Sequence, residues 1–288
     1  MNYELNCNRF LTALACTLAF VAPVGAEDAA KDHLEIDPAK FDYSTKIDNN
    51  WWPLKPGTQH VYAGFTVEDD EQIRHSVVET VTDLTKEIGG VRAVIILEED
   101  FSDGQLVEQE IAYHAQDNEG NVWHLGELSE TYEEKEFVGG RVWFVGQPEG
   151  AKAGIRMWAN PRVGMAASQG FAPPPFHWTD RGRVYQMGQK TEVAAGSYDN
   201  VLIVEEWDEE SSEGAFQTKF YAPGVGIVRI GFRGPDPDQE ELELVKTEQL
   251  NPDGMAKARA KALAIEERAY MYSLTPPAER MTVSPQGE

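Results

Sequence analysis

The sequence predicts a mainly β protein: a curved antiparallel meander, in the form of a half-barrel or open barrel, with a Pro/Gly-rich covering loop and one C-terminal α-helix. Short runs of β-branched and aromatic residues alternate with turn residues over most of the chain. The first connections are only a few residues long, which permits antiparallel neighbours and leaves no room for a crossover helix. An Ala-rich, charged stretch of helical character appears only near the C-terminus.

The N-terminus indicates an export signal over residues 1–26, because Arg9 precedes the apolar run 11–21 and small residues end the segment. We therefore expect a periplasmic or secreted protein of about 262 residues. Both cysteines, Cys7 and Cys16, lie inside the signal. The mature chain thus has no thiol for a disulfide, a zinc-thiolate site or a cysteine nucleophile.

Lipid anchoring at Cys16 is not expected, because an alanine stands where a branched apolar residue is usual and the apolar run continues past the cysteine. No later stretch is long and apolar enough to span a membrane. The formal net charge of −24 repels phosphate backbones, which excludes nucleic acid as an expected partner. With 41% hydrophobic residues, the chain can build one sizeable core. The oligomeric state stays open.

The expected strands follow a polar leader, residues 27–48. In the first half they are 60–67, 74–84, 91–97, 105–116 and 121–127, and a hairpin over 134–145 turns at Gly139-Gly140. In the second half they are 183–193, 198–207, 215–222, 226–232 and 241–247. Together they form a single antiparallel domain, residues 49–250.

Residues 146–182 interrupt this pattern as an insertion rich in Gly and Pro that still carries large apolar side chains. We expect it to pack on the sheet as a covering loop. A helix over 251–274 follows, since Asn251 is a good N-cap and Pro252 suits the first helical position. Its basic residues are expected to dock on acidic protein surface. The tail is 275–288.

Several segments resemble a widespread family of secreted bacterial proteins of unknown function. The segments are NNWWPLKPGTQHVYAGFTVE (49–68), YHAQDNEGNVWHLGE (113–127), MWANPRVGM (157–165), AAGSYDNVLIVEE (194–206) and FYAPGVGIVRI (220–230). In that family the first motif typically reads N-P-Y-F-P-L-x-P-G-T-x-W-x-Y. The resemblance brings no activity; the last motif also recurs in lipoprotein-like half-barrels, which supports the architecture only by analogy.

The stretch 113–127 places two histidines on either side of a turn. A three-residue loop, Asn118 to Gly120, needs a positive φ only at Gly120, so we expect His114 to oppose His124. The same register pairs Asp117 with Asn121, Gln116 with Val122, Ala115 with Trp123 and Tyr113 with Leu125. The two imidazoles would then be close enough to share a metal, a proton or a ligand, while Tyr113 and Trp123 face the core.

Three interpretations of this pair stay open. A metal site would need a further ligand such as His60, His75 or His177, and none has a motif spacing. A catalytic pair would use Glu127 or Asp117 as a helper in a secreted hydrolase or lyase. A wall of a ligand pocket is favoured, because the resembling family tends to carry Tyr or Phe at both histidine positions. Histidines sealed under aromatic rings would argue against catalysis.

We expect an exported binding or accessory protein rather than an enzyme, with no cofactor. Its ligand, a small or lipid-like molecule, would lie between the concave sheet and the cover. The expected ligand-binding residues are His114, His124, Trp158, Phe171, Phe176, His177 and Trp178. A structural envelope protein is the remaining alternative, with an exposed sheet edge used for assembly. The acidic stretches 100–104 and 235–238 suit turns better than calcium loops.

Overall fold

The computed structural model describes residues 35–68, 71–174, 176–269 and 279–280. The predicted signal peptide with Cys16 lies outside the described residues, as do the start of the leader and most of the C-terminal tail. Among the helices that are described, none combines the length and the apolar character that a membrane crossing requires.

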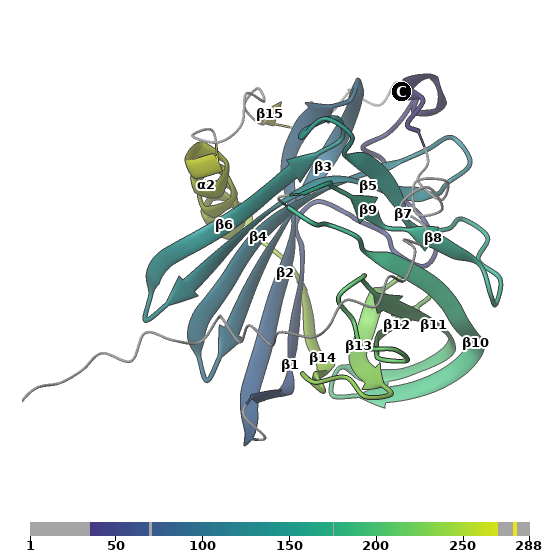
Figure 1. The fold of residues 1–288 in the computed structure, drawn as a ribbon, viewed down its shortest axis with the longest axis vertical. Coiled ribbons are helices and arrows are strands. Elements are labelled where there is room, and N and C mark those ends of the chain that lie inside the picture. Colours follow the sequence, from purple (N-terminus) through teal and green to yellow (C-terminus); the bar gives the residue numbers. More distant parts are fainter. Residues whose placement is uncertain (1–34, 69–70, 175, 270–278, 281–288) are drawn as a thin grey trace, which may run out of the picture. The chain divides into compact units, whose positions relative to one another are not determined.

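One antiparallel sheet dominates the fold (Figure 1). The strands are, in chain order, β1 (Thr58–Glu68), β2 (Glu71–Ile88), β3 (Val91–Ser102), β4 (Gln105–Gln116), β5 (Val122–Glu133), β6 (Glu136–Phe144), β7 (Lys152–Met157), β8 (Ala166–Ser168), β9 (Gly170–Phe171), β10 (Arg181–Val193), β11 (Gly196–Trp207), β12 (Phe216–Ala222), β13 (Gly226–Arg233), β14 (Glu241–Gln249) and β15 (Glu279–Arg280). A short 3₁₀ helix, η2 (Pro38–Lys40), precedes them, and the helix α2 (Pro252–Ala269) follows β14. The predicted fold class is confirmed.

The sheet is curled but open. Its spatial order is β8-β10-β11-β12-β13-β14-β1-β2-β3-β4-β5-β7-β9, with β6 against β5 and β15 against β2. The two ends of this order, β8 and β9, are separated in the chain by the single residue Gln169. The curl therefore brings the sheet ends together without a continuous hydrogen-bonded ladder between them.

Two sequence expectations are corrected here. The segment 146–182 is not only a covering loop, because it supplies β7, which pairs with β5, and β8, which pairs with β10. These strands are short and lie in a segment rich in Gly and Pro, so the sequence pattern did not identify them as strands. The second hairpin turns at Glu134 and Lys135, both with positive φ, and not at Gly139-Gly140, which lie inside β6.

Strand β3 is buried on both faces. Ala93, Ile95 and Leu97 join an outer core with β4, β5 and helix α2. Val94 and Ile96 point the other way and join an inner core with side chains of β1, β11 and β13. Alternating side chains of one strand thus serve two cores, which explains why residues 91–97 form an almost continuous apolar run.

Helix α2 packs on the outer face of β2, β3, β4 and β5 (Figure 1). The ion pair between Lys86 and Glu266 is almost fully buried, with 1% of each side chain exposed, and Tyr113 donates a 2.5 Å hydrogen bond to the same carboxylate. Further helix cations pair with sheet carboxylates: Arg259 with Asp83, Lys261 with Glu99, and Arg268 with Glu130. Docking of the basic helix residues on acidic protein surface is confirmed.

The buried pair gives a stability prediction. Lys86→Met removes the cation that is paired with the buried Glu266 carboxylate and should lower the free energy of unfolding by about 3–5 kcal/mol in urea titrations. The double variant Lys86→Met/Glu266→Gln removes both charges, keeps an acceptor for Tyr113 and should recover most of that loss. Lys190→Met, which breaks the exposed pair with Asp199, is the control and should leave stability unchanged. Equal losses in Lys86→Met and Lys190→Met would contradict the prediction.

Candidate functional site

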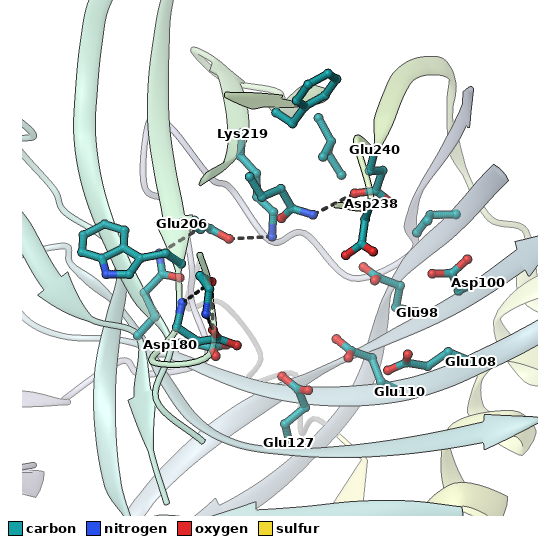
Figure 2. Close-up of a pocket in the computed structure, with 18 of the residues that line it drawn as sticks. Glu98, Asp100, Glu108, Glu110, Glu127, Asp180, Glu206, Lys219, Asp238 and Glu240 are labelled. Carbon is teal, nitrogen blue, oxygen red and sulfur yellow. Dashed lines mark hydrogen bonds and ion pairs between the residues drawn. The ribbon is translucent and has the colours of Figure 1, made fainter. Parts of the chain in front are cut away.

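The concave face of the sheet lines an open cavity of about 960 Å³. Strand register decides which side chains enter it. Glu79 of β2 lies opposite Glu98 of β3, and Glu98 lies opposite Glu110 of β4. One row further along, Asp100 opposes Glu108. Because opposed side chains have Cβ atoms about 5 Å apart, the strands form two rows of facing carboxylates, which are seen around the cavity in Figure 2.

The predicted turn between β4 and β5 is confirmed, but the predicted pairing of Tyr113 is wrong. Gly120 has a φ of 90°, Asp117 donates its backbone N–H to Asn121, and His114 lies opposite His124. Tyr113, however, pairs with Gly126 and not with Leu125, because the register shifts by one residue. This bulge changes which side of β5 faces inward.

The bulge is the reason that Glu127 lines the cavity. Trp123 and Leu125 point to the outer core and His124 points inward, so regular alternation would turn residue 127 outward. The extra residue moves Glu127 to the cavity side, where its carboxylate lies 3.5 Å from Nε2 of His124. Strict alternation of the sequence pattern could not have predicted this position.

The two histidines form a stacked pair. Their ring centroids are 4.9 Å apart with an interplanar angle of 10°. Trp52 packs edge-on against His114, and Trp143 packs edge-on against His124. Only 3% of His114 and 4% of His124 is exposed.

The hydrogen bonds of this pair are incomplete. His124 Nδ1 lies 3.0 Å from the backbone oxygen of Gln169, whereas neither ring nitrogen of His114 has a hydrogen-bond partner among the described residues. Burial is the main cause that lowers the pKa of His124 to about 3 and the pKa of His114 well below its ordinary value. Both imidazoles are therefore neutral at neutral pH.

The segment that leads into β1, which begins at Asn49, positions the Trp52 side chain beside the histidine pair. The side chain of Asn49 accepts hydrogen bonds from the backbone of Trp51 and Trp52 and donates to the backbone oxygen atoms of Gly120 and Trp158. Hydrogen bonds thereby connect the segment before β1 to the turn between β4 and β5, the two strands that carry His114 and His124. This contact explains why Trp52 is buried and lies beside His114.

The carboxylates of β3, β4 and β5 hold protons unusually tightly. Burial, together with the neighbouring Glu79, raises the pKa of Glu98 to about 8. Burial and the nearby Asp180 raise the pKa of Glu127 to about 8, and burial with Glu127 raises the pKa of Glu110 well above its ordinary value.

The opposite wall is electrostatically matched. Glu206 lies 2.8 Å from Lys219 and 3.3 Å from Arg156, and Gln169 donates to it at 3.1 Å. Despite the burial of Glu206, these cations lower its pKa to about 2. Glu206 therefore stays ionised, and it forms ion pairs with both Arg156 and Lys219.

A third charged group lies at the end of the carboxylate rows. His75 Nε2 lies 3.0 Å from Asp100 and 3.1 Å from Glu240. These two carboxylates outweigh the effect of burial and raise the pKa of His75 to about 10. The imidazolium links β2 to the segment before β14 and neutralises part of the acidic row.

The structure brings together six of the nine candidate residues. His114, His124, Glu127, Phe176, His177 and Trp178 line the cavity. Trp158 packs against the outer core, and Phe171 pairs with Lys152 between β9 and β7. Asp117 caps its own turn and accepts a hydrogen bond from the Trp123 indole, so it has a local structural role.

The sequence analysis missed the central carboxylates, Glu98, Glu108 and Glu110. The signal was the alternation of acidic residues at the ends of two adjacent strands, which register then brings face to face. Within the described part of the chain, no three His, Cys, Asp or Glu side chains converge closely enough to hold a metal ion. The stretch 235–238 forms a turn in which Asp236 accepts from the backbone of Asp238 and Gln239.

Comparison with known proteins gives no family assignment, because no family model and no curated protein matches the chain. A predicted exported protein with a YmcC-like fold from Bacteroides fragilis is 12% identical, with a TM-score of 0.38 over 69% of this chain and 99% of that chain. A predicted lipoprotein from Parabacteroides distasonis is 13% identical, with a TM-score of 0.37 over 70% and 100%. These scores are too low to transfer properties, so the function has to be argued from the cavity.

The cavity carboxyls give a pH prediction. At pH 7 the folded chain keeps protons on Glu98 and Glu127 that the unfolded chain has released, so unfolding releases protons and stability falls as pH rises through about 8. His75 acts in the same direction, while His114 and His124 oppose it only near and below their ordinary pKa of about 6.5.

We therefore expect the Tm measured by circular dichroism to fall between about pH 7 and pH 9. Glu98→Gln/Glu127→Gln should show a smaller fall, because two of the groups no longer titrate. Glu119→Gln, an exposed turn variant, should behave like the wild type. A Tm that rises over this window, or an equal fall in all three proteins, would refute the assignment.

The bulge gives a second prediction. A Cβ added at Gly126 would lie 2.6 Å from the carbonyl oxygen of Trp143 and 2.7 Å from the Phe144 ring. Gly126→Ala should therefore lower the free energy of unfolding by about 1–3 kcal/mol. Gly139→Ala, where a Cβ meets nothing within 4 Å, should cause no comparable loss in the same urea titration.

Proposed function

We propose that this chain is a non-catalytic binding protein that holds a small polar molecule in the cavity of its curled sheet. The observation that carries the proposal is a space of about 960 Å³ lined by side chains of β2, β3, β4, β5, β12 and β13. That volume lies at the upper end of the range found for small-molecule sites. The N-terminal sequence pattern further supports export to the periplasm or beyond.

The lining favours a polar ligand over a lipid-like one. Apolar ligands require walls that are mostly hydrophobic with a few polar groups. Here the carboxylates Glu98, Glu110 and Glu127 occupy the middle of the wall, and Lys219 and Glu206 face them (Figure 2). Burying an alkyl chain against these groups would strip them of water without replacing the hydrogen bonds.

A hydrolase or lyase is supported less well. The candidate base, His124, has a pKa lowered to about 3, so it is a weak proton acceptor at neutral pH. His114 lies between Trp52 and His124, which fixes its ring but aligns no carboxylate with it. A structural envelope protein would not need a polar cavity of this size, and the cavity therefore favours binding.

Native mass spectrometry of the protein secreted by its own host tests the proposal. We expect a bound mass, or an adduct formed from a polar metabolite extract, in the wild type. Ile230→Trp places a large ring in the cavity and should abolish the adduct, while Val245→Trp on the exposed side of β14 should keep it. Circular dichroism melts confirm that both variants fold. A wild type that binds nothing from the extract, or an adduct that survives Ile230→Trp, would overturn the proposal.

A further inference from the structure

The carboxylates on the outer and inner faces of the sheet differ in whether they form ion pairs. On the outer face, Glu99 is paired with Lys261 at 2.6 Å and Glu130 with Arg268 at 2.6 Å. On the inner face, Glu98 is the chain neighbour of Glu99, yet it forms no hydrogen bond or ion pair with any described residue. Helix α2 thus supplies a cation for each of these outer carboxylates, whereas Glu98 on the inner face has no ion-pair partner among the described residues.

The positively charged side chains that line the cavity are His75, Arg141, Arg156, Arg181 and Lys219. Arg156 and Lys219 both pair with Glu206, and His75 is held between Asp100 and Glu240. Arg141 lies over the Trp178 ring, 5.1 Å from its centroid. Glu98 and Glu110, which oppose each other on β3 and β4, therefore have no ion pair with a described cation, an arrangement that destabilises a sheet unless protons or another cation neutralise it.

His114 provides an independent sign of a missing partner. Its side chain is 97% buried, lines the same cavity and lies on the same face of β4 as Glu110, but both ring nitrogens lack a hydrogen-bond partner. A buried polar group without a partner costs about 1–3 kcal/mol. A neutral imidazole offers one acceptor, which an N–H donor of a ligand would satisfy.

These observations specify the ligand class, and the inference rests on the proposed function. We propose that the cavity binds an organic cation with two or more ammonium or guanidinium groups, a polyamine-like molecule, with its nitrogen atoms between Glu98, Glu110 and Glu127 and one N–H directed at His114.

An elongated organic cation fits better than a metal ion. The acidic groups are spread over neighbouring strands about 5 Å apart and over rows about 7 Å apart along each strand. Calcium requires six to eight oxygen atoms converging at about 2.3–2.6 Å, and no such cluster exists among the described residues. Nitrogen atoms separated by short alkyl chains match a row of carboxylates instead.

Binding should release protons. Without ligand, the raised pKa values of Glu98, Glu110 and Glu127 favour their protonated forms, and a polyvalent cation would displace these protons. The other charged or titratable groups that line the cavity are Tyr62, Glu68, His75, Glu79, Asp100, Glu108, His114, His124, Arg141, Arg156, His177, Asp180, Arg181, Glu206, Asp208, Glu210, Lys219, Asp236, Asp238 and Glu240. Affinity should therefore increase as pH rises from about 6.5 to 8.5.

Isothermal titration calorimetry with spermidine and putrescine, in about 150 mM NaCl to screen the acidic surface, tests the inference. We expect saturable one-site binding, with proton release measured as a heat difference between phosphate and Tris buffers at pH 7.5. Glu98→Gln/Glu110→Gln should weaken binding about tenfold or more, since each charged hydrogen bond contributes about 1.5–3 kcal/mol. Glu119→Gln, which removes an exposed charge, should bind like the wild type. The double variant relieves repulsion and should fold, which a thermal melt checks.

Each contrary outcome is distinct. Spermidine binding that Glu98→Gln/Glu110→Gln leaves unchanged would reduce the effect to surface charge and overturn the inference. Binding of calcium chloride in place of both amines would also overturn it. A neutral or anionic metabolite could form an adduct that Ile230→Trp abolishes while neither amine binds. That result would refute the organic cation as the ligand and leave the proposed binding function intact. If nothing binds, both fail.

Discussion

Two-sided burial of the strands β3, β4 and β5 determines the rest of the structure. Successive side chains along these strands pack alternately against helix α2 on one face and against the interior of the curled sheet on the other. On the outer face the solution is apolar packing supplemented by ion pairs to α2, of which the Lys86 and Glu266 pair is the most deeply buried. On the inner face the apolar residues end at Ile96 and Ala112, and the carboxylates begin beyond them. The cavity starts where the inner core stops.

The bulge at Gly126 couples these two faces. One additional residue in β5 keeps Leu125 in the outer core and still directs Glu127 inward. The close approach of the Trp143 carbonyl leaves no space for a side chain at position 126. A local backbone irregularity therefore adds a carboxylate to the cavity without disturbing the packing of the helix.

Local patterns in the sequence predicted the architecture well. Alternation and short turns identified the antiparallel strands, and turn chemistry placed His114 opposite His124, because a two-residue loop would require a positive φ at Glu119 as well as at Gly120. Strands β7, β8 and β9 could not be predicted, since they are too short for periodicity and depend on partners distant in the chain. The turn at Glu134-Lys135 was missed for a related reason, as two charged residues adopt a conformation in which glycine is usual.

The site was harder to predict because it depends on register between strands. His114 and His124 drew attention as a pair within one hairpin, whereas Glu98 and Glu110 belong to different strands whose alignment the sequence does not state. Phe176, His177 and Trp178 line the cavity, whereas Trp158 packs against the outer core and Phe171 pairs with Lys152 between β9 and β7.

The acidic interior also changes the meaning of the net charge. A charge of −24 on the whole chain is accounted for most simply by solubility, and exposed acids at a turn such as Glu119 fit that explanation. Acids that face one another in a cavity do not, because they lower stability wherever they ionise. A chain that already pairs Glu99 and Glu130 with helix cations has the means to neutralise such groups. That Glu98 and Glu110 form no ion pair with any described residue argues that the compensating charge comes from outside the chain.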